Sequence, residues 1–322
     1  MLTTEEITLA YRLFLGREPE NQDVVIALQQ NIHTYEDLRK NFLNSHEFLQ
    51  KASEFIGEQQ NVRLRHPLLP SIPVELEVSD EDLPKMLDRI HNEWEALGKN
   101  NPYWSVLTQD QFGKSKFENN RSEFFSSGKY PVDAFLASLR RNKINPNTLE
   151  SCIDVGCGVG RVTRFLAPAF KKVIGLDISQ PHLEIAKEYL AAEGITNVEL
   201  IHSGRLEVFD NLPMVDAIYS IIVLQHNSPP IMVRMMKALF KALKPKGVAY
   251  LQIPTYRNGY LFEVKRYLNS IPPDTLEMHF LPQDEIFKLI EESGCICLEV
   301  REDGMVAEDH FTLSHTFLIQ KK

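Results

Sequence analysis

Three glycines between two strand-like runs mark the part of the chain that is best suited to binding a ligand. The stretch from Cys152 to Arg164 reads Cys-Ile-Asp-Val-Gly-Cys-Gly-Val-Gly-Arg-Val-Thr-Arg, with Gly156, Gly158 and Gly160 after a short apolar run. Glycine tolerates positive φ and has no Cβ, so the turn can be tight and a ligand can lie against bare backbone. The next apolar run ends at Asp177, where open α/β sheets bind the hydroxyl groups of a ribose.

The spacing around these glycines distinguishes two classes of nucleotide site. Nicotinamide dehydrogenases carry G-x-G-x-x-G, but the sixth position counted from Gly156 is Arg161, too large for close contact between helix and strand. Asp154 would repel a pyrophosphate and suits a cationic ligand. The pattern acid-x-Gly-x-Gly-x-Gly with a strand-end aspartate resembles the cofactor site of class I S-adenosylmethionine-dependent methyltransferases. The alternative is that the glycines form only a tight strand-to-helix turn.

The resemblance implies that S-adenosylmethionine is the cofactor and that Asp154 serves the ammonium group of its methionine, directly or through water. One feature departs from the family pattern, because His202-Ser-Gly-Arg-Leu has no carboxylate before Glu207 to accept from the adenine amino group. We therefore expect backbone groups near Arg205 to hold the adenine. The expected cofactor-binding residues are Asp154, Gly156, Cys157, Gly158, Gly160, Arg161, Asp177, Ile178, Arg205, Leu206 and Gln225.

A loop after the fourth predicted strand, Val223-Leu-Gln-His-Asn-Ser-Pro-Pro230, should lie beside the reacting methyl group, because ligands bind beyond the carboxyl ends of the strands. A hydroxyl acceptor must lose a proton as it attacks, and histidine suits that task near neutral pH. His226 is the first candidate for a general base, and His310 and His279 follow. The alternative for His226 is a structural role in shaping the loop. We expect His182, His202 and His315 to be structural.

Aromatic side chains gather in two regions that could cover the acceptor. Residues 255–281 are extra to the minimal fold, and a second group lies before the glycine strand. Aromatic faces suit sugar rings and flat phenolic acceptors equally, and core packing is the alternative for most of these residues. The expected acceptor contacts are Tyr103, Trp104, Tyr130, Asn227, Tyr256 and Tyr260.

Composition narrows the class of protein. The chain has 322 residues, a net charge of −9, 43% hydrophobic and 25% charged residues, which is typical of a soluble globular protein with room for two domains. The acidic balance argues against a nucleic-acid partner. No apolar stretch is long enough for a membrane span, and the start Met-Leu-Thr-Thr-Glu-Glu lacks the character of a signal peptide. We expect a cytoplasmic protein.

The cysteines indicate neither a disulfide framework nor a metal site. Cys152 and Cys157 flank the glycine turn, and Cys295 and Cys297 lie in a strand-like run, with no C-x-x-C pair and no Cys/His cluster. We expect reduced thiols and no metal.

Three parts are predicted along the chain. Residues 1–60 should form an N-terminal helical domain with helices 23–30 and 35–44, begun by a cap at Thr3 or Thr4. Residues 61–142 should form a linker and helical cap, with helices 80–97, 121–127 and 131–142. Residues 143–322 should form the S-adenosylmethionine-dependent methyltransferase domain.

The third part alternates strands and helices, which predicts a parallel sheet. The expected strands are 151–155, 173–177, 198–202, 215–221 and 247–253, with helices 181–193 and 230–243 between them and a turn at Lys244–Gly247. Strands 295–300 and 312–320 should form an antiparallel hairpin at the sheet edge. The predicted fold class is α/β, a Rossmann-like seven-stranded class I methyltransferase sheet preceded by a small all-α domain.

The N-terminal segment carries a second resemblance. Ala10-Tyr-Arg-Leu-Phe-Leu-Gly-Arg-Glu-Pro-Glu and Phe42-Leu-Asn-Ser-His-Glu-Phe are similar to a short helical domain that is appended to bacterial glycan-synthesis proteins and resembles phycobilisome linker modules. It implies docking to a protein partner, or alternatively self-association. From Pro102 onward the chain resembles uncharacterised bacterial methyltransferases found among glycan-modifying enzymes.

These observations favour an O-methyltransferase acting on a glycan, a nucleotide-sugar or a lipid-linked saccharide. Two alternatives remain: a small-molecule O- or N-methyltransferase of secondary metabolism, and a non-catalytic scaffold that retains the fold. The intact Asp154, glycines and Asp177 argue against the scaffold.

Overall fold

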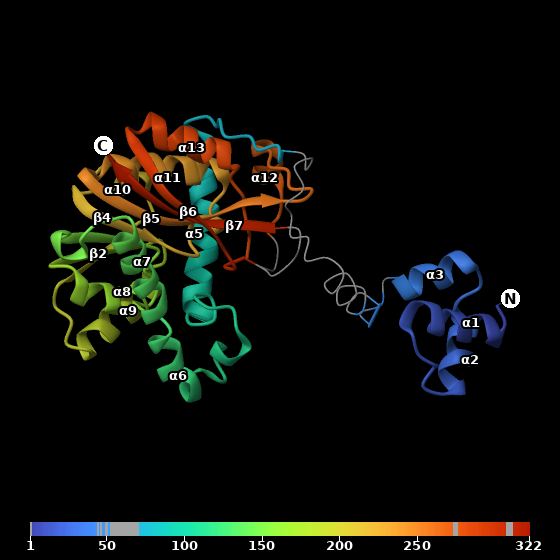
Figure 1. The fold of residues 1–322 in the computed structure, drawn as a ribbon. Helices are drawn as coiled ribbons and strands as arrows, with labels where there is room; N and C mark the ends of the chain where they lie inside the picture. The colour runs from blue at the N-terminus through green and yellow to red at the C-terminus, as the bar shows by residue number, and fades with distance from the viewer. Residues whose placement is uncertain are drawn as a thin grey trace. The chain divides into compact units, whose positions relative to one another are not determined.

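The structure is a computed structural model that describes residues 2–43, 45, 47–48, 51, 71–272, 276–306 and 312–322. The chain divides into two compact units, Met1–Pro67 and Leu68–Lys322 (Figure 1).

The first unit is helical in its described residues. Its first helix begins as the sequence indicates, because the Thr3 side chain accepts from Glu6 N at 3.2 Å and the Glu6 carboxylate accepts from Thr3 N at 2.7 Å. Ile7, Tyr11 and Phe42 meet in a small apolar core. The helices are α1 (Thr4–Ala10), the π-helix η1 (Tyr11–Leu15), α2 (Gln22–Asn31) and α3 (Tyr35–Leu43).

The two sequence motifs of this unit meet in an ion pair. Gly16 ends η1 with φ at 64°, and Arg17 after it donates to both carboxylate oxygens of Glu47, at 2.7 and 2.6 Å. Arg17 also donates to Glu20 at 2.7 Å. These motif residues therefore hold the helical unit together, since a guanidinium binds a carboxylate in two places with defined geometry.

The second unit contains a seven-stranded sheet with the order β3-β2-β1-β4-β5-β7-β6. The first five strands are parallel to one another, and β7 is antiparallel to both β5 and β6. This confirms the predicted α/β sheet with its antiparallel C-terminal pair. The strands are β1 (Ser151–Val155), β2 (Lys172–Asp177), β3 (Val198–His202), β4 (Val215–Ser220), β5 (Leu243–Arg257), β6 (Cys295–Asp303) and β7 (Thr312–Lys321).

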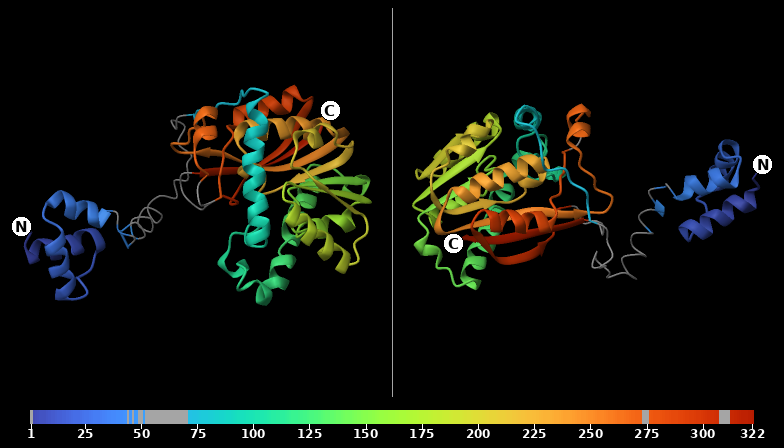
Figure 2. Two further views of the ribbon diagram at one scale, coloured as in Figure 1. Left: turned by 180° about the vertical axis from the view of Figure 1, so that it is seen from behind. Right: turned by 90° about the horizontal axis from the view of Figure 1, so that it is seen from above.

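Helices cover both faces of the sheet (Figure 2). Ile153 and Val155 of β1 pack into one core with side chains of α10, α11 and α13, whereas Cys152 packs into another with side chains of α7 and α8. This alternation follows from the two-residue period of a strand. The helices are α6 (Phe117–Ser126), α7 (Lys129–Arg141), α8 (Thr163–Leu166), α9 (Gln180–Ala192), α10 (Leu206–Asp210), α11 (Pro229–Lys241), α12 (Val264–Asn269) and α13 (Gln283–Glu292), with 3₁₀ turns η2 (Asp110–Phe112), η3 (Pro146–Thr148), η4 (Ala167–Ala169) and η5 (Leu224–His226).

The longest helix, α5 (Asp82–Asn100), crosses the sheet at the ends of its strands (Figure 1). It contacts α9 on one side and α11 on the other, so it bridges the two helical layers. Its end lies close to α9, because a Cβ built on Gly98 would stand 2.4 Å from the Ser179 hydroxyl. Leu87 and Ile90 of this helix belong to the core that also contains Val155 and Leu176, at the carboxyl ends of β1 and β2.

One local prediction was wrong. The turn expected at Lys244–Gly247 lies inside β5, which already starts at Leu243, and α11 ends at Lys241. The register between β4 and β5 shifts here, and Lys246 takes a φ of 66°. The Pro and Gly that signalled a turn instead form an irregularity within a strand, as bulges often do.

Two further expectations concern the cysteines and membrane-spanning helices. All four cysteines fall within the described ranges and are free thiols. Among the described residues, no helix combines the length and apolar character needed to cross a bilayer.

Candidate active site

The glycine turn after β1 has the tight geometry that its sequence predicts. Gly156, Gly158 and Gly160 have φ of 70°, 53° and 81°, values that favour glycine over other residues. A Cβ on Gly156 would lie only 2.3 Å from a methyl of Val223, so this position has no room for a side chain. Gly156 and Cys157 both donate backbone hydrogen bonds to the carbonyl of Leu176, which fixes the turn against β2.

Asp177 closes the same turn from the end of β2. Its two carboxylate oxygens accept from Gly158 N at 2.7 Å and from Ser179 N at 2.8 Å. The side chain is buried, and each oxygen keeps a lone pair for a further donor. The carboxylate is thus held in one orientation, with capacity left for ribose hydroxyl groups.

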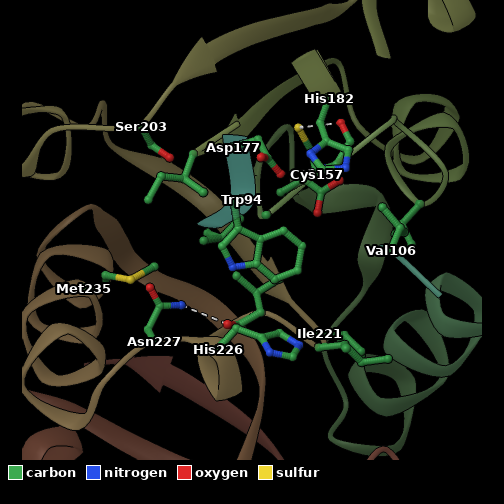
Figure 3. Close-up of a pocket in the computed structure, with 18 of the residues that line it drawn as sticks. Trp94, Val106, Cys157, Asp177, His182, Ser203, Ile221, His226, Asn227 and Met235 are labelled. Carbon is green, nitrogen blue, oxygen red and sulfur yellow. Dashed lines mark hydrogen bonds between the residues drawn. The ribbon is translucent and has the colours of Figure 1, made fainter. Parts of the chain in front are cut away.

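These elements surround a cavity at the carboxyl ends of β1 to β4. The indole of Trp94, from α5, lies across its centre, with Asp177 and His182 on one side and His226 on the other (Figure 3). Its walls are formed by Leu87, Ile90, Trp94, Ser105, Val106, Asp154, Val155, Gly156, Cys157, Gly158, Arg161, Val162, Asp177, Ile178, His182, Ser203, Phe209, Tyr219, Ile221, Ile222, Val223, His226, Asn227 and Met235.

Two buried groups of opposite charge line this cavity. Burial raises the pKa of Asp154 to about 7, although the Thr163 hydroxyl donates to it at 2.7 Å. Arg161 donates through Nη1 to Ser127 Oγ at 3.0 Å, and its Nε finds no hydrogen-bond partner among the described residues. The contacts that hold these two side chains thus leave capacity for a ligand that carries both an ammonium and a carboxylate group.

His226 is held neutral beside Trp94. Its Nδ1 lies 2.9 Å from the backbone oxygen of Glu277, and because a carbonyl only accepts, Nδ1 carries the proton. Its Nε2 is then an acceptor, 3.2 Å from the amide nitrogen of Gln225. Burial lowers the pKa of His226 to about 4. The imidazole and the Trp94 ring meet edge to face, with centroids 5.2 Å apart.

The other candidate bases lie elsewhere. His279 is buried behind the loop of His226, where its backbone N donates to Gln225 O at 2.7 Å and its Nδ1 lies 2.9 Å from the Tyr260 hydroxyl. His279 is not one of the described residues that line the cavity. His310 lies outside the described residues.

Most of the expected cofactor residues line the cavity, and four do not. Gly160 packs instead toward Leu190 of α9, and Gln225 turns away from the cavity to accept from Gln252 at 3.2 Å. Arg205 and Leu206 do not line the cavity either. Ser203 and Phe209, from the same part of the chain, line it instead. The first residue after β3, Ser203, reaches the cavity in place of Arg205.

The predicted aromatic acceptor contacts do not gather over the cavity. Tyr103 stacks on Phe117 with ring centroids 3.4 Å apart, Tyr130 is 77% exposed, and Tyr260 reaches His279. Tyr256 lies in β5 opposite Leu313, and Trp104 is also absent from the described wall. Of the six residues, only Asn227 lines the cavity, where it donates to Val223 O at 2.9 Å (Figure 3).

Trp94 and His182 are among the wall residues that sequence reasoning did not assign to the site. Trp94 lies in the helix predicted at 80–97, and its i,i+4 spacing from Ile90 is the signal that both share one apolar face. His182 was expected to be structural, but it lines the cavity while its Nε2 lies 2.9 Å from Ser105 Oγ and 3.1 Å from Pro102 O.

Comparisons with known proteins identify the chemistry. A family model described as a methyltransferase domain matches residues 152–247. The ubiquinone biosynthesis O-methyltransferase of Haemophilus ducreyi is 28% identical over 60% of this chain and 86% of its own length. The N-terminal Xaa-Pro-Lys N-methyltransferase 1-B of Xenopus laevis is 25% identical over 66% of this chain and 89% of its own length.

A solved structure has the same fold. The magnesium protoporphyrin IX methyltransferase of Synechocystis with bound SAH, S-adenosylhomocysteine, superposes with a TM-score of 0.52 at 17% identity, covering 74% of this chain and 100% of that one. The matched domain contains β1, the glycine turn and Asp177, which form the cavity described above. The protein is an S-adenosylmethionine-dependent methyltransferase.

Proposed function

We propose that the protein transfers a methyl group to a hydroxyl oxygen of its acceptor, with His226 as the general base. The observation that supports this most directly is the state of His226: a buried, neutral imidazole with an unprotonated Nε2, on the wall of the cofactor cavity. The ubiquinone biosynthesis relatives are O-methyltransferases, which agrees with a hydroxyl acceptor.

The cavity wall fits S-adenosylmethionine. In this proposal the carboxylate of Asp154 binds the ammonium group, the guanidinium of Arg161 binds the methionine carboxylate, and Asp177 accepts from the ribose hydroxyl groups. The glycine turn leaves the backbone bare beside these groups. When bound, the cofactor supplies a methyl group on a cationic sulfur, which is electrophilic without help from the protein.

The chain's own residues would then align the acceptor and remove its proton. Trp94 lies across the cavity, where it would limit the access of water. His226 Nε2 carries the one unprotonated lone pair of the ring, and an attacking hydroxyl would take the place of the Gln225 amide that now lies 3.2 Å from it. The backbone oxygen of Glu277 stabilises the protonated ring, since it accepts from Nδ1 throughout. Alignment and proton removal are the two contributions that a methyltransferase needs for an alcohol acceptor.

The identity of the acceptor belongs to the same proposal. The resemblance of residues 102–322 to glycan-associated methyltransferases favours a saccharide hydroxyl, as a glycan, a nucleotide-sugar or a lipid-linked saccharide. The ubiquinone biosynthesis relatives favour a small hydroxylated molecule instead. Both share the chemistry of a weakly acidic hydroxyl, so the experiment must decide between them.

Two measurements test the proposal. Extracts incubated with the protein and isotopically labelled S-adenosylmethionine are analysed by mass spectrometry, and a labelled methyl ether on a saccharide or small molecule is the expected product. His226→Asn and His226→Ala are then assayed with that acceptor. Asparagine keeps a donor for the Glu277 carbonyl but lacks the base, so both variants should lose at least about a hundredfold in turnover.

Cofactor affinity, measured by calorimetry, should stay close to the parent value in both variants. The exposed His33→Ala serves as the control and should be fully active. A methyl group found on nitrogen or carbon contradicts the hydroxyl assignment. Near-normal turnover in His226→Asn contradicts the assignment of the base.

A further inference from the structure

Three metal-ligating side chains meet outside the cavity wall. His91 and Glu95 lie one turn apart on α5, and His202 is the last residue of β3. One ligand atom from each lies within 4.8 Å of the other two. The His91 Nε2 to Glu95 Oε1 distance is 3.6 Å, and the two imidazole rings have centroids 5.3 Å apart.

Neighbouring groups fix the orientation of two of these side chains. His202 Nε2 lies 2.8 Å from the backbone oxygen of Ile178, so Nε2 carries the proton and Nδ1 keeps its lone pair. Glu95 Oε1 accepts from Gln180 N at 2.8 Å. Metal-binding histidines usually donate their second ring nitrogen to a carbonyl or carboxylate in this way.

The space between the ligands is kept open by a glycine. A Cβ on Gly204 would lie 2.7 Å from His202 Cε1 and 3.3 Å from His91 Cε1, so a side chain there would push the rings apart. The three residues are half-buried, which leaves a path to solvent. Lys99 pairs with Glu95 at 3.5 Å, and its side chain is 66% exposed, so it can swing away.

We propose that His91, Glu95 and His202 bind one Zn²⁺ ion. Two imidazole nitrogens and one carboxylate are a donor set that zinc takes with an open fourth position for water. Zinc bonds of about 2 Å place tetrahedral ligand atoms roughly 3.3 Å apart. The three ligand atoms lie within 4.8 Å of one another, so movement of the side chains alone would bring them to that spacing. Mg²⁺ and Ca²⁺ are disfavoured, because they prefer oxygen ligands.

The position gives the ion a structural consequence. His202 pairs with Asp177 in the sheet register, and Trp94 lies between His91 and Glu95 in the sequence of α5. The ion would therefore join α5, which carries Trp94 over the cavity, to the strand beside Asp177. Sequence spacing did not reveal this site, because two ligands come from α5 and the third from β3, which is distant in the sequence.

The test uses the full-length protein after treatment with a chelator. Calorimetry with Zn²⁺ should show one ion bound per chain, and Co²⁺ should give the visible absorption of a four-coordinate site. Three variants remove one ligand each with little other change. His202→Gln keeps a donor for the Ile178 carbonyl, and Glu95→Gln keeps an acceptor for Gln180 N. His91→Ala removes a ring whose Nε2 lies 3.6 Å from Glu95 Oε1.

Each variant should bind Zn²⁺ at least about tenfold more weakly, since even changes around metal ligands act on that scale. Lys99→Met should bind Zn²⁺ as tightly as the parent or more tightly, because it removes a competing cation. The exposed His33→Ala is the control for surface histidines and should match the parent.

Zn²⁺ should also raise the melting temperature of the parent and not of His202→Gln, because an ion that binds only the folded state stabilises it. Zn²⁺ binding that is unchanged in all three ligand variants would show an adventitious ion and overturn the proposal. A parent protein that binds no Zn²⁺ would also overturn the proposal.

Discussion

The carboxylate of Asp177 accepts a hydrogen bond of 2.7 Å from the backbone N–H of Gly158. The end of β2 thereby fixes the glycine turn that follows β1, even though 19 residues separate the two groups. One side chain thus shapes the turn and also presents its remaining lone pairs to the cavity. Loss of Asp177 should affect both stability and cofactor binding.

Asp177→Ala should lower the free energy of unfolding by about 2 kcal/mol or more, since hydrogen bonds to a charged group contribute about 1.5–3 kcal/mol each. S-adenosylmethionine binding should fall in parallel, as measured by calorimetry. Asp216→Ala is the matched control, because Asp216 accepts from Ser151 N at 2.9 Å at the other end of the sheet. It should lower stability with cofactor affinity retained, and equal loss of affinity in both variants would contradict the role of Asp177.

Gly156→Ala should destabilise the protein for two separable reasons. Alanine at a φ of 70° costs about 1–2 kcal/mol, and the new Cβ would meet Val223 at 2.3 Å. Gly194 has the same φ with nothing within 4 Å, so Gly194→Ala carries only the first cost. Adding Val223→Ala to Gly156→Ala should restore part of the loss. Thermal unfolding of the four proteins checks this, and equal losses at both glycines would be the contrary result.

Cofactor binding should depend on pH through Asp154. Burial raises the pKa of Asp154 to about 7, so the side chain is largely protonated at pH 6 and largely ionised at pH 8. The ammonium group of the cofactor favours the carboxylate, which means that binding releases a proton and that affinity rises with pH through about 7.

Calorimetry in two buffers of different ionisation enthalpy measures that proton. The release should be present in the parent protein and absent in Asp154→Asn, whose affinity should be weaker at pH 8. A parent protein whose affinity and proton release do not change between pH 6 and pH 8 would rule out this role for Asp154.

Trp94 should report cofactor binding by its fluorescence. The chain has two tryptophans, so Trp104→Phe leaves Trp94 as the only indole. Because the Trp94 indole lies across the cavity, S-adenosylmethionine should change its emission in proportion to occupancy (Figure 3). Trp94→Phe, with Trp104 intact, should show little change. A full response in Trp94→Phe would place the cofactor away from α5.

Much of the fold followed from patterns that are local in the sequence. Of the two expected caps, Thr3 and Thr4, the structure has Thr3, and the strands β1 and β3 have the predicted bounds, because each depends on neighbouring residues. The irregularity in β5 was missed because Lys-Pro-Lys-Gly has the composition of a turn. Only pairing with β4 and β7 keeps that segment in the sheet.

The sequence by itself determined the glycine turn, the carboxylates Asp154 and Asp177, and the order of strands and helices, since these depend on backbone geometry and short-range spacing. Tertiary structure decided that α5 crosses the cavity and that His226 is buried neutral against Glu277. It also brought His91 and Glu95 to His202. An apolar helix face shows that a helix packs, but only the packing of the whole molecule selects the surface that it covers.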